Sequence, residues 1–319
     1  MFTSHSLIPV ALLCYSVLAS PLQRRESTGV ISGSLLDSFN LYEQYAATAY
    51  CHANTHSPMS SKIACAKGNC QRVAQADTKS ALEFHSKALT GATGYLAFDK
   101  TNQVVILSFR GSESVMNWVT DLTVVPVPVD LCNGCLAHGG IWTSWLAVRD
   151  EIKEAMIVTA GVHPGYKIVV TGHSLGAGLA TFAATEFRNL GLTVDLVSLA
   201  SPRVGNPALA RYITNQSPML GQNYRFTHLN DPVPNFPTEA LGFQHPSPEY
   251  YIKSPNGAPV TNNDITVCAG LGNSNCNARW KTSDPNAHDW YFDKVSACYD
   301  GGIETGVLNL GINTGLNLV

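Results

Sequence analysis

Apolar side chains recur along this chain with two different periods. Residues 35–50 and 141–160 carry them at the three- and four-residue spacing of amphipathic helices. Short apolar or β-branched runs bounded by turn residues predict strands over 94–99, 104–110, 167–172, 194–200 and 224–230. The run at 167–172 is rich in β-branched residues, which is typical of a central strand with both faces covered. The chain therefore alternates between helical and strand patterns.

The order of these patterns predicts the sheet topology. The strand at 167–172 is followed by an Ala-rich helix over 175–191, and the strand at 194–200 by a helix capped by Asn206 with Pro207 at its first position. Strands separated by helices pair in parallel through right-handed crossovers. The sequence therefore predicts a single α/β domain over residues 26–299.

Both ends of the chain differ from this pattern. The apolar run at 7–19 is too short to span a bilayer and ends in small residues, which predicts a signal peptide over 1–19; the alternative is a buried N-terminal segment. Residues 20–25 end in Arg24-Arg25 and form a candidate propeptide. Residues 300–319 are a C-terminal extension of unknown role, and its removal, docking or disorder all stay open.

Composition narrows the classes of function. Of the 319 residues 45% are hydrophobic and 13% charged, and a formal net charge of −3 without a basic stripe argues against nucleic acid as a partner. Eight cysteines remain outside the signal segment, an even number typical of secreted proteins. Their close spacings suggest the pairs Cys65–Cys70, Cys132–Cys135 and Cys268–Cys276, which leaves Cys51 and Cys298. A redox or metal role for the CNGC segment is the alternative, which an oxidising compartment disfavours.

The segment VVTGHSLGAG contains a candidate nucleophile. Ser174 stands between Gly172 and Gly176, after a predicted strand and before a predicted helix. A sharp strand-to-helix turn of this kind exposes the serine hydroxyl, and glycines allow the close approach of its neighbours. The helix N-terminus also directs partial positive charge toward the serine. The context therefore favours a nucleophilic serine over a serine in an ordinary turn.

A nucleophilic serine needs a base, and the base needs an acid that orients it. Asp231 follows the strand at 224–230, at the carboxyl end where parallel-sheet sites form, whereas Asp195 begins its strand. The alternative role for Asp231 is an Asx turn before Pro232. Only His245 and His288 lie further along the chain, and the residues alone leave both open, with a modest preference for His288.

Negative charge that develops on the substrate oxygen needs donors. The backbone N–H of Leu175, directly after the serine, is one candidate. Ser112 follows the strand at 104–110 and is the second, through its backbone N–H and its hydroxyl; an ordinary helix N-cap is the alternative.

A short amphipathic helix is predicted after Ser112. Its apolar stripe consists of Val115, Trp118, Val119 and Leu122. Such a helix beside the oxyanion loop could be a surface helix packed on the core or a lid that turns its apolar face toward lipid. Both interpretations stay open from the residues.

Several long motifs in order resemble one family. They are VVILSFRGSESVMNW, LCNGCLAHGGIWTSW, VVTGHSLGAGLA, PRVGNPALA, HLNDPVPNFP, GFQHPSPEYYIKS and AHDWYF. Together they are similar to the secreted triacylglycerol lipases of filamentous fungi, lipase class 3, over residues 35–298. The resemblance implies an α/β-hydrolase fold, with a central, mostly parallel sheet flanked by helices and with a helical lid. It also implies a secreted enzyme that hydrolyses triacylglycerols at a lipid interface without cofactor or metal.

The resemblance also implies residue roles. Carried over by position, the nucleophile is Ser174, the acid Asp231 and the base His288, which favours His288 over His245. The oxyanion residues are Ser112 and Leu175, and the lid tryptophan is Trp118. It supports Cys51–Cys298, Cys65–Cys70 and Cys132–Cys135 as disulfides.

One departure keeps other substrates open. The additional pair Cys268 and Cys276 resembles the feruloyl-esterase branch of the same family, whereas Trp118 and its apolar stripe favour a lipase. A phenolic ester or a phospholipid is therefore the alternative substrate. The rival of a different class is a binding protein with an inactive hydrolase fold, which the complete serine, aspartate and histidine set disfavours.

Overall fold

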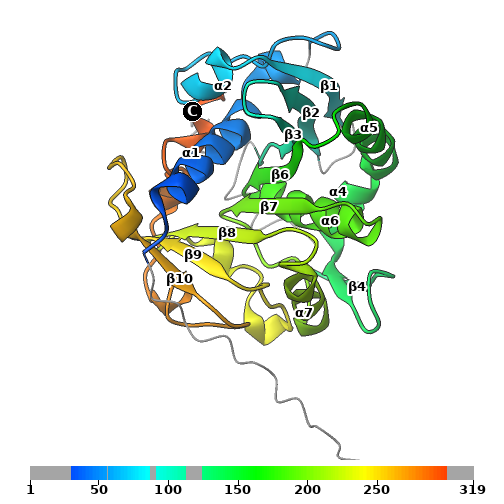
Figure 1. The fold of residues 1–319 in the computed structure, drawn as a ribbon. Helices are drawn as coiled ribbons and strands as arrows, with labels where there is room; N and C mark the ends of the chain where they lie inside the picture. Colours follow the sequence, from blue (N-terminus) through cyan, green and yellow to red (C-terminus); the bar gives the residue numbers. More distant parts are fainter. Residues whose placement is uncertain (1–29, 56, 87–90, 113–123, 300–319) are drawn as a thin grey trace, which may run out of the picture.

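A single eight-stranded sheet organises the fold in the computed structural model, which describes residues 30–55, 57–86, 91–112 and 124–299 (Figure 1). The strand order is β1-β2-β3-β6-β7-β8-β9-β10. The strands are β1 Thr78–His85, β2 Thr93–Asp99, β3 Val104–Phe109, β6 Lys167–His173, β7 Val194–Leu199, β8 Asn223–His228, β9 Glu249–Ile252 and β10 Ile265–Cys268. The candidate signal peptide, the candidate propeptide and the C-terminal extension all lie outside the described residues.

The centre of the sheet is parallel and its edges are antiparallel. Strands β3, β6, β7, β8 and β9 run parallel to one another, whereas β1 and β2 at one edge and β10 at the other pair in antiparallel. A separate hairpin joins β4 (Pro126–Pro128) and β5 (Leu136–His138). This confirms the α/β-hydrolase-type architecture with a mostly parallel central sheet.

Helices cover both faces of the sheet (Figure 1). They are α1 Gly33–Thr48, α2 Gln71–Gln75, α4 Gly139–Leu146, α5 Arg149–Val162, α6 Leu175–Asn189 and α7 Pro207–Gln216. Short 3-10 turns are η1 His52–Asn54, η2 Val233–Asn235, η3 Glu239–Leu241, η4 Asn262–Asp264, η5 Asn277–Arg279, η6 Pro285–His288 and η7 Val295–Cys298. As predicted, Asn206 caps α7, because its side chain accepts from the Leu209 N–H.

Two hydrophobic cores lie on opposite faces of the sheet. In β3, Leu107 and Phe109 belong to the core under α4, α5 and α6, whereas Val104 and Ile106 belong to the core under α1. Successive strand residues point to opposite faces, so one strand feeds both cores. Each fully buried Leu, Ile or Phe contributes about 1.5–3 kcal/mol. The central strands are therefore fixed from both sides.

The single helix predicted over 141–160 is wrong, because the structure forms two helices, α4 and α5. Val148 between them leaves helical geometry, with φ −126° and ψ −5°. Asp150 and Glu151 occupy the first turn of α5, where negative charge stabilises a helix start. Hydrophobic periodicity continues across this break and therefore does not reveal it.

Four disulfides join the eight described cysteines. Three of them are local: Cys65–Cys70, Cys132–Cys135 and Cys268–Cys276. The fourth, Cys51–Cys298, spans 247 residues and connects the segment after α1 to the end of η7. Among the described residues, no helix has both the length and the apolar character needed to cross a membrane.

Candidate active site

Ser174 occupies a sharp turn between β6 and α6. Its backbone has φ 58° and ψ −126°, and its N–H donates to the Leu199 carbonyl at 2.9 Å. A Cβ on Gly172 would overlap the Gly176 carbonyl, and one on Gly176 would overlap the carbonyl of Phe109. Side chains at these two positions would therefore push apart the strand, the turn and the helix. The strained backbone of Ser174 persists because its surroundings fix it.

Asp231 and His288 lie in direct contact, although 57 residues separate them in the sequence. His288 Nδ1 is 3.0 Å from both carboxylate oxygens of Asp231, which is fully buried. The carboxylate also accepts the Tyr291 hydroxyl at 2.6 Å and the Val233 N–H at 2.9 Å. The aspartate is therefore held by four contacts and orients the imidazole through Nδ1.

His245, the other histidine after Asp231, does not join this group. Its Nε2 donates to the Pro234 carbonyl at 2.7 Å. Burial lowers the pKa of His245 well below its usual value, with the charges of Arg225 and Arg203 adding to the effect. His245 is therefore a neutral histidine within a buried polar cluster.

Two buried polar atoms of this region have no hydrogen-bond partner among the described residues: Ser174 Oγ and His288 Nε2. The ring of His288 lies 4.5 Å, between centroids, from the ring of His173, the residue before Ser174. Buried polar atoms are rarely left unpaired, and catalytic hydrogen bonds often close only with substrate. The unpaired hydroxyl and the unpaired imidazole nitrogen come from neighbouring parts of one site.

His173 joins the serine turn to the histidine. The Tyr50 hydroxyl donates to His173 Nδ1 at 2.7 Å, and His173 Nε2 donates to the His288 carbonyl at 2.8 Å. Burial lowers the pKa of His173 well below its usual value, and the neighbouring His288 adds to this. A neutral His173 therefore holds the backbone of His288 without placing a second positive charge beside it.

The two predicted oxyanion donors lie on segments that meet Ser174. Leu175 is the first residue of α6, so its N–H has no acceptor within the helix. Ser112 is half-buried and follows Gly111, where an added Cβ would lie 3.0 Å from Ser174 Cβ. The lid residues Val115, Trp118, Val119 and Leu122 lie outside the described residues.

Comparisons with known proteins identify the family. The class 3 lipase family model matches residues 106–241, and the lipase 3 N-terminal region matches residues 3–80. The chain is 45% identical to a secreted mono- and diacylglycerol lipase A of Penicillium cyclopium, over 92% of this chain and 94% of that protein. The chain belongs to the lipase class 3 family.

Solved structures agree with this assignment. A mono- and diacylglycerol lipase from Aspergillus oryzae has 42% identity and a TM-score of 0.79, covering 82% of this chain and 98% of that one. A triacylglycerol lipase whose catalytic centre is a triad of serine-protease type has 27% identity and a TM-score of 0.74, covering 84% and 98%. This lipase-family chain therefore shares its fold with fungal lipases over nearly all of their length.

Sequence reasoning on this class 3 lipase missed two tyrosines that contact the site. Tyr50 lies just after α1, 124 residues before Ser174 in the sequence (174 minus 50). Tyr291 lies three residues after His288, and this spacing is the only local signal for its contact with Asp231. Among the described residues, the one group of three metal-ligating atoms is the sulfurs of Cys51, Cys70 and Cys298, and all three belong to disulfides.

Proposed function

We propose that this class 3 lipase is a secreted serine esterase that hydrolyses acylglycerols through an acyl-enzyme. The observation that carries the proposal is the Asp231–His288 pair, together with the unpaired buried atoms His288 Nε2 and Ser174 Oγ and the contact of the His288 ring with His173, the residue before Ser174. A nucleophile, a base and an orienting acid within one buried site are the parts that acyl transfer needs.

In the proposed mechanism, Ser174 Oγ attacks the ester carbonyl carbon while His288 Nε2 takes the hydroxyl proton. The carbonyl oxygen becomes an oxyanion and accepts from the backbone N–H of Leu175 and from Ser112. His288 then returns the proton to the leaving alcohol, and the acyl group stays on Ser174 as an ester. Water, deprotonated by His288, attacks this ester and releases the fatty acid.

Asp231 has two roles in this scheme. Its contact with Nδ1 keeps the proton on that nitrogen, so that Nε2 is free to act as the base. Its negative charge stabilises the imidazolium that forms during each transfer. Burial, with Asp231 adding to it, raises the pKa of Tyr291 well above its usual value, so the phenol stays a donor to the carboxylate.

The substrate class has two candidate members. The sequence predicts triacylglycerols, whereas the relatives from Penicillium cyclopium and Aspergillus oryzae are named for mono- and diacylglycerols. We therefore propose acylglycerols as the class, with partial glycerides as the favoured members, and the triacylglycerol prediction stays a prediction. The Cys268–Cys276 disulfide keeps a feruloyl ester as a second candidate, and a phospholipid ester stays an alternative prediction.

The amphipathic helix predicted over 113–122 is proposed to be a lid that opens at lipid interfaces. The apolar stripe of Val115, Trp118, Val119 and Leu122 supports this. With a closing lid, activity on long-chain glycerides rises steeply once an emulsion or micelle forms. A rate that changes smoothly across that boundary would contradict the lid.

Secretion is proposed as well, with 1–19 as a signal peptide, 20–25 as a propeptide and 26–299 as the catalytic domain. The relatives named as secreted lipases and the eight paired cysteines support it. N-terminal sequencing of the protein from culture medium tests these boundaries.

The decisive experiment combines Ser174→Ala with a substrate panel. The wild-type protein should react with a fluorophosphonate at Ser174, and Ser174→Ala should lose both labelling and hydrolysis of mono-, di- and triacylglycerols. Methyl ferulate and phospholipid are the comparison substrates. A folded Ser174→Ala protein with undiminished ester hydrolysis would overturn the mechanism, and a preference for ferulate would overturn the substrate class.

A further inference from the structure

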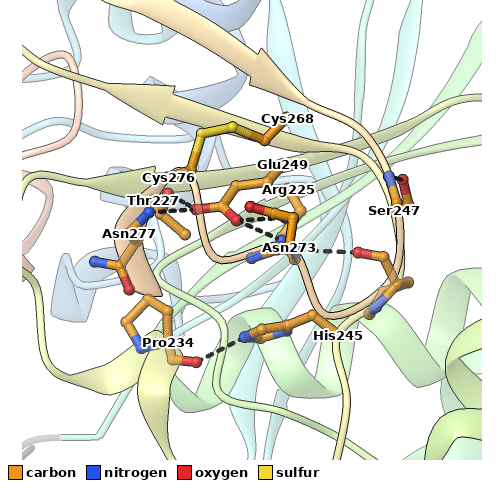
Figure 2. Close-up of polar contacts among 12 residues, drawn as sticks. Arg225, Thr227, Pro234, His245, Ser247, Glu249, Cys268, Asn273, Cys276 and Asn277 are labelled. Atoms are coloured by element: carbon orange, nitrogen blue, oxygen red, sulfur yellow. Dashed lines mark hydrogen bonds and ion pairs between the residues drawn. A yellow bond between two sulfur atoms is a disulfide. The ribbon is translucent and has the colours of Figure 1, made fainter. Parts of the chain in front are cut away.

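A buried polar cluster joins residues of β8, of β9 and of the segment after β10 (Figure 2). Its centre is Glu249 at the start of β9, which is only 3% exposed. The Glu249 carboxylate accepts from Arg225 and Asn273 at 3.0 Å each, and from the Thr227 hydroxyl at 2.6 Å. Its fourth donor is the backbone N–H of Asn277, at 3.0 Å. A buried charge with this many partners forms a rigid anchor.

Asn277 connects that anchor to the candidate triad. Its side-chain Nδ2 donates to two carbonyls, those of Leu229 and Asp231, at 3.0 Å each. Its Oδ1 accepts from Asn235 Nδ2 at 2.9 Å. Asn277 is 2% exposed, so these bonds form in a site without bulk water. One side chain therefore fixes the backbone on both sides of residue 230.

The backbone that Asn277 holds is under strain. Leu229 has φ 37°, in the left-handed region that residues with a side chain rarely adopt. This turn takes the chain from the end of β8 to the carboxylate that contacts His288. Without a partner for its carbonyls, a strained turn of this kind relaxes and moves the residue that follows it.

The Cys268–Cys276 disulfide brings Asn277 to this position. Cys276 directly precedes Asn277, and Cys268 is the register partner of Glu249 in the β9–β10 pair. The disulfide thus ties the residue before Asn277 to the strand beside the anchor (Figure 2). This gives the additional cysteine pair a role in the geometry of the site.

We propose that Asn277 is a positioning residue, which holds the Asp231 turn so that the Asp231 carboxylate faces His288 Nδ1. This inference rests on the proposed catalytic roles of Asp231 and His288. Asn277 acts through the backbone and does not contact the reacting atoms. Removal of the Asn277 side chain should therefore make His288 a weaker base and Ser174 a weaker nucleophile. Substrate binding should stay nearly unchanged.

Asn277→Ala tests this, with Asn273→Ala as the matched control. Both variants remove one asparagine side chain from the same cluster, but Asn273 Nδ2 donates to Glu249 and not to the Asp231 turn. Asn277→Ala should lower kcat about tenfold or more with KM within about twofold, and slow fluorophosphonate labelling of Ser174 by the same factor. Asn273→Ala should keep both rates within about twofold of wild type.

Several outcomes would overturn the inference. They are a kcat for Asn277→Ala within twofold of wild type, an equal loss in Asn273→Ala, or a loss confined to KM. If Asn277→Ala fails to fold, Asn277→Ser decides, because its single hydroxyl can serve only one carbonyl and should give a smaller loss of the same kind. Asp231→Asn separates the two proposals: if it keeps full activity, the proposed triad fails, and if it is inactive while Asn277→Ala is normal, only the positioning role fails.

Discussion

The serine side and the acid–base side of the candidate site are fixed by different physical means. On the serine side, the backbones of β3, β6 and α6 approach so closely that glycine is required at Gly172 and Gly176. On the acid–base side, Asp231 and His288 lie on turns, and side chains such as Tyr291 and Asn277 hold them. Steric exclusion by the backbone builds one half, and a network of polar side chains builds the other.

This difference predicts how each half fails. A clash between backbone atoms cannot relax without moving a strand, so damage to the serine side should appear as lost stability. A polar contact on the acid–base side can be removed without moving the sheet, so damage there should appear as lost turnover in a folded protein. Four variants test this contrast, in order of decreasing effect.

The largest effect is expected for Asp231→Asn. An amide donates to His288 Nδ1 and forces the proton to Nε2, the nitrogen that is the proposed base. We expect kcat to fall by about 10³- to 10⁴-fold, measured at saturating ester concentration. Thermal unfolding is the control and shows how much of the variant is folded. If the loss of folded protein accounts for the whole fall in kcat, the contrast between the two sides is wrong.

Gly176→Ala should act on stability instead. The added Cβ would overlap the Phe109 carbonyl and lie 2.7 Å from that of Arg110. Overpacking of this kind costs about 3 kcal/mol of unfolding free energy, measured by denaturant titration. Gly161→Ala, in the last turn of α5 with nothing within 4 Å, is the matched control and should stabilise by about 0.5 kcal/mol. Equal effects at the two glycines would show that close backbone approach is not what fixes the turn.

Through His138, the stability of the serine side should depend on pH. It caps α4, whose residue Ile141 packs against Gly178 of α6, and burial lowers the pKa of His138 to about 4. The unfolded chain, with a histidine pKa near 6.5, binds the proton more readily than the folded one. This contribution to stability is complete above pH 6.5 and is lost as the pH falls toward 4.

His138→Asn keeps a capping side chain and removes the titration. Between pH 7 and pH 5, the variant should lose about 2 kcal/mol less unfolding free energy than the wild type, at about 1.4 kcal/mol for each pH unit below 6.5. Denaturant titration at the two pH values measures this. The same loss in both proteins would mean that protonation of other groups governs acid unfolding.

Tyr291→Phe should have the smallest of the four effects. The effect should be limited to kcat. The change removes one donor from the Asp231 carboxylate and leaves the ring packed in the core. A hydrogen bond to a charged group contributes about 1.5 kcal/mol, so kcat should fall about tenfold at unchanged KM. Tyr212→Phe, which removes an exposed hydroxyl bond of 2.7 Å to Asn189, should change neither value.

The same contrast explains which parts of the molecule can be predicted from the sequence. The strand, the glycines and the helix of the Ser174 turn follow one another in the sequence, so a short motif predicts them, whereas the close approach of Phe109 to Gly176 comes from the fold. The choice between His245 and His288 depends on pairing across 57 residues, and the residues alone left it open. The local pattern favours His288 only modestly, and the family resemblance adds the stronger preference for it.

Other features cannot be predicted from the sequence, for related reasons. Tyr50 and Asn277 contact the site through hydrogen bonds whose direction depends on the fold, and no local pattern marks them. The break between α4 and α5 at Val148 lies within continuous hydrophobic periodicity. In contrast, the parallel pairing of β6, β7 and β8 followed from the alternation of strands and helices, because strands joined by helices pair in parallel.

The disulfide between Cys51 and Cys298 has a consequence for how the protein responds to cleavage by a protease. It closes a covalent ring over 247 residues of sequence, and the serine, the aspartate and the histidine all lie inside that ring. A single cut in any loop between the two cysteines therefore opens the ring without releasing a fragment. The halves stay at the high effective concentration of a linked pair, so that a nicked molecule keeps its parts within reach of one another.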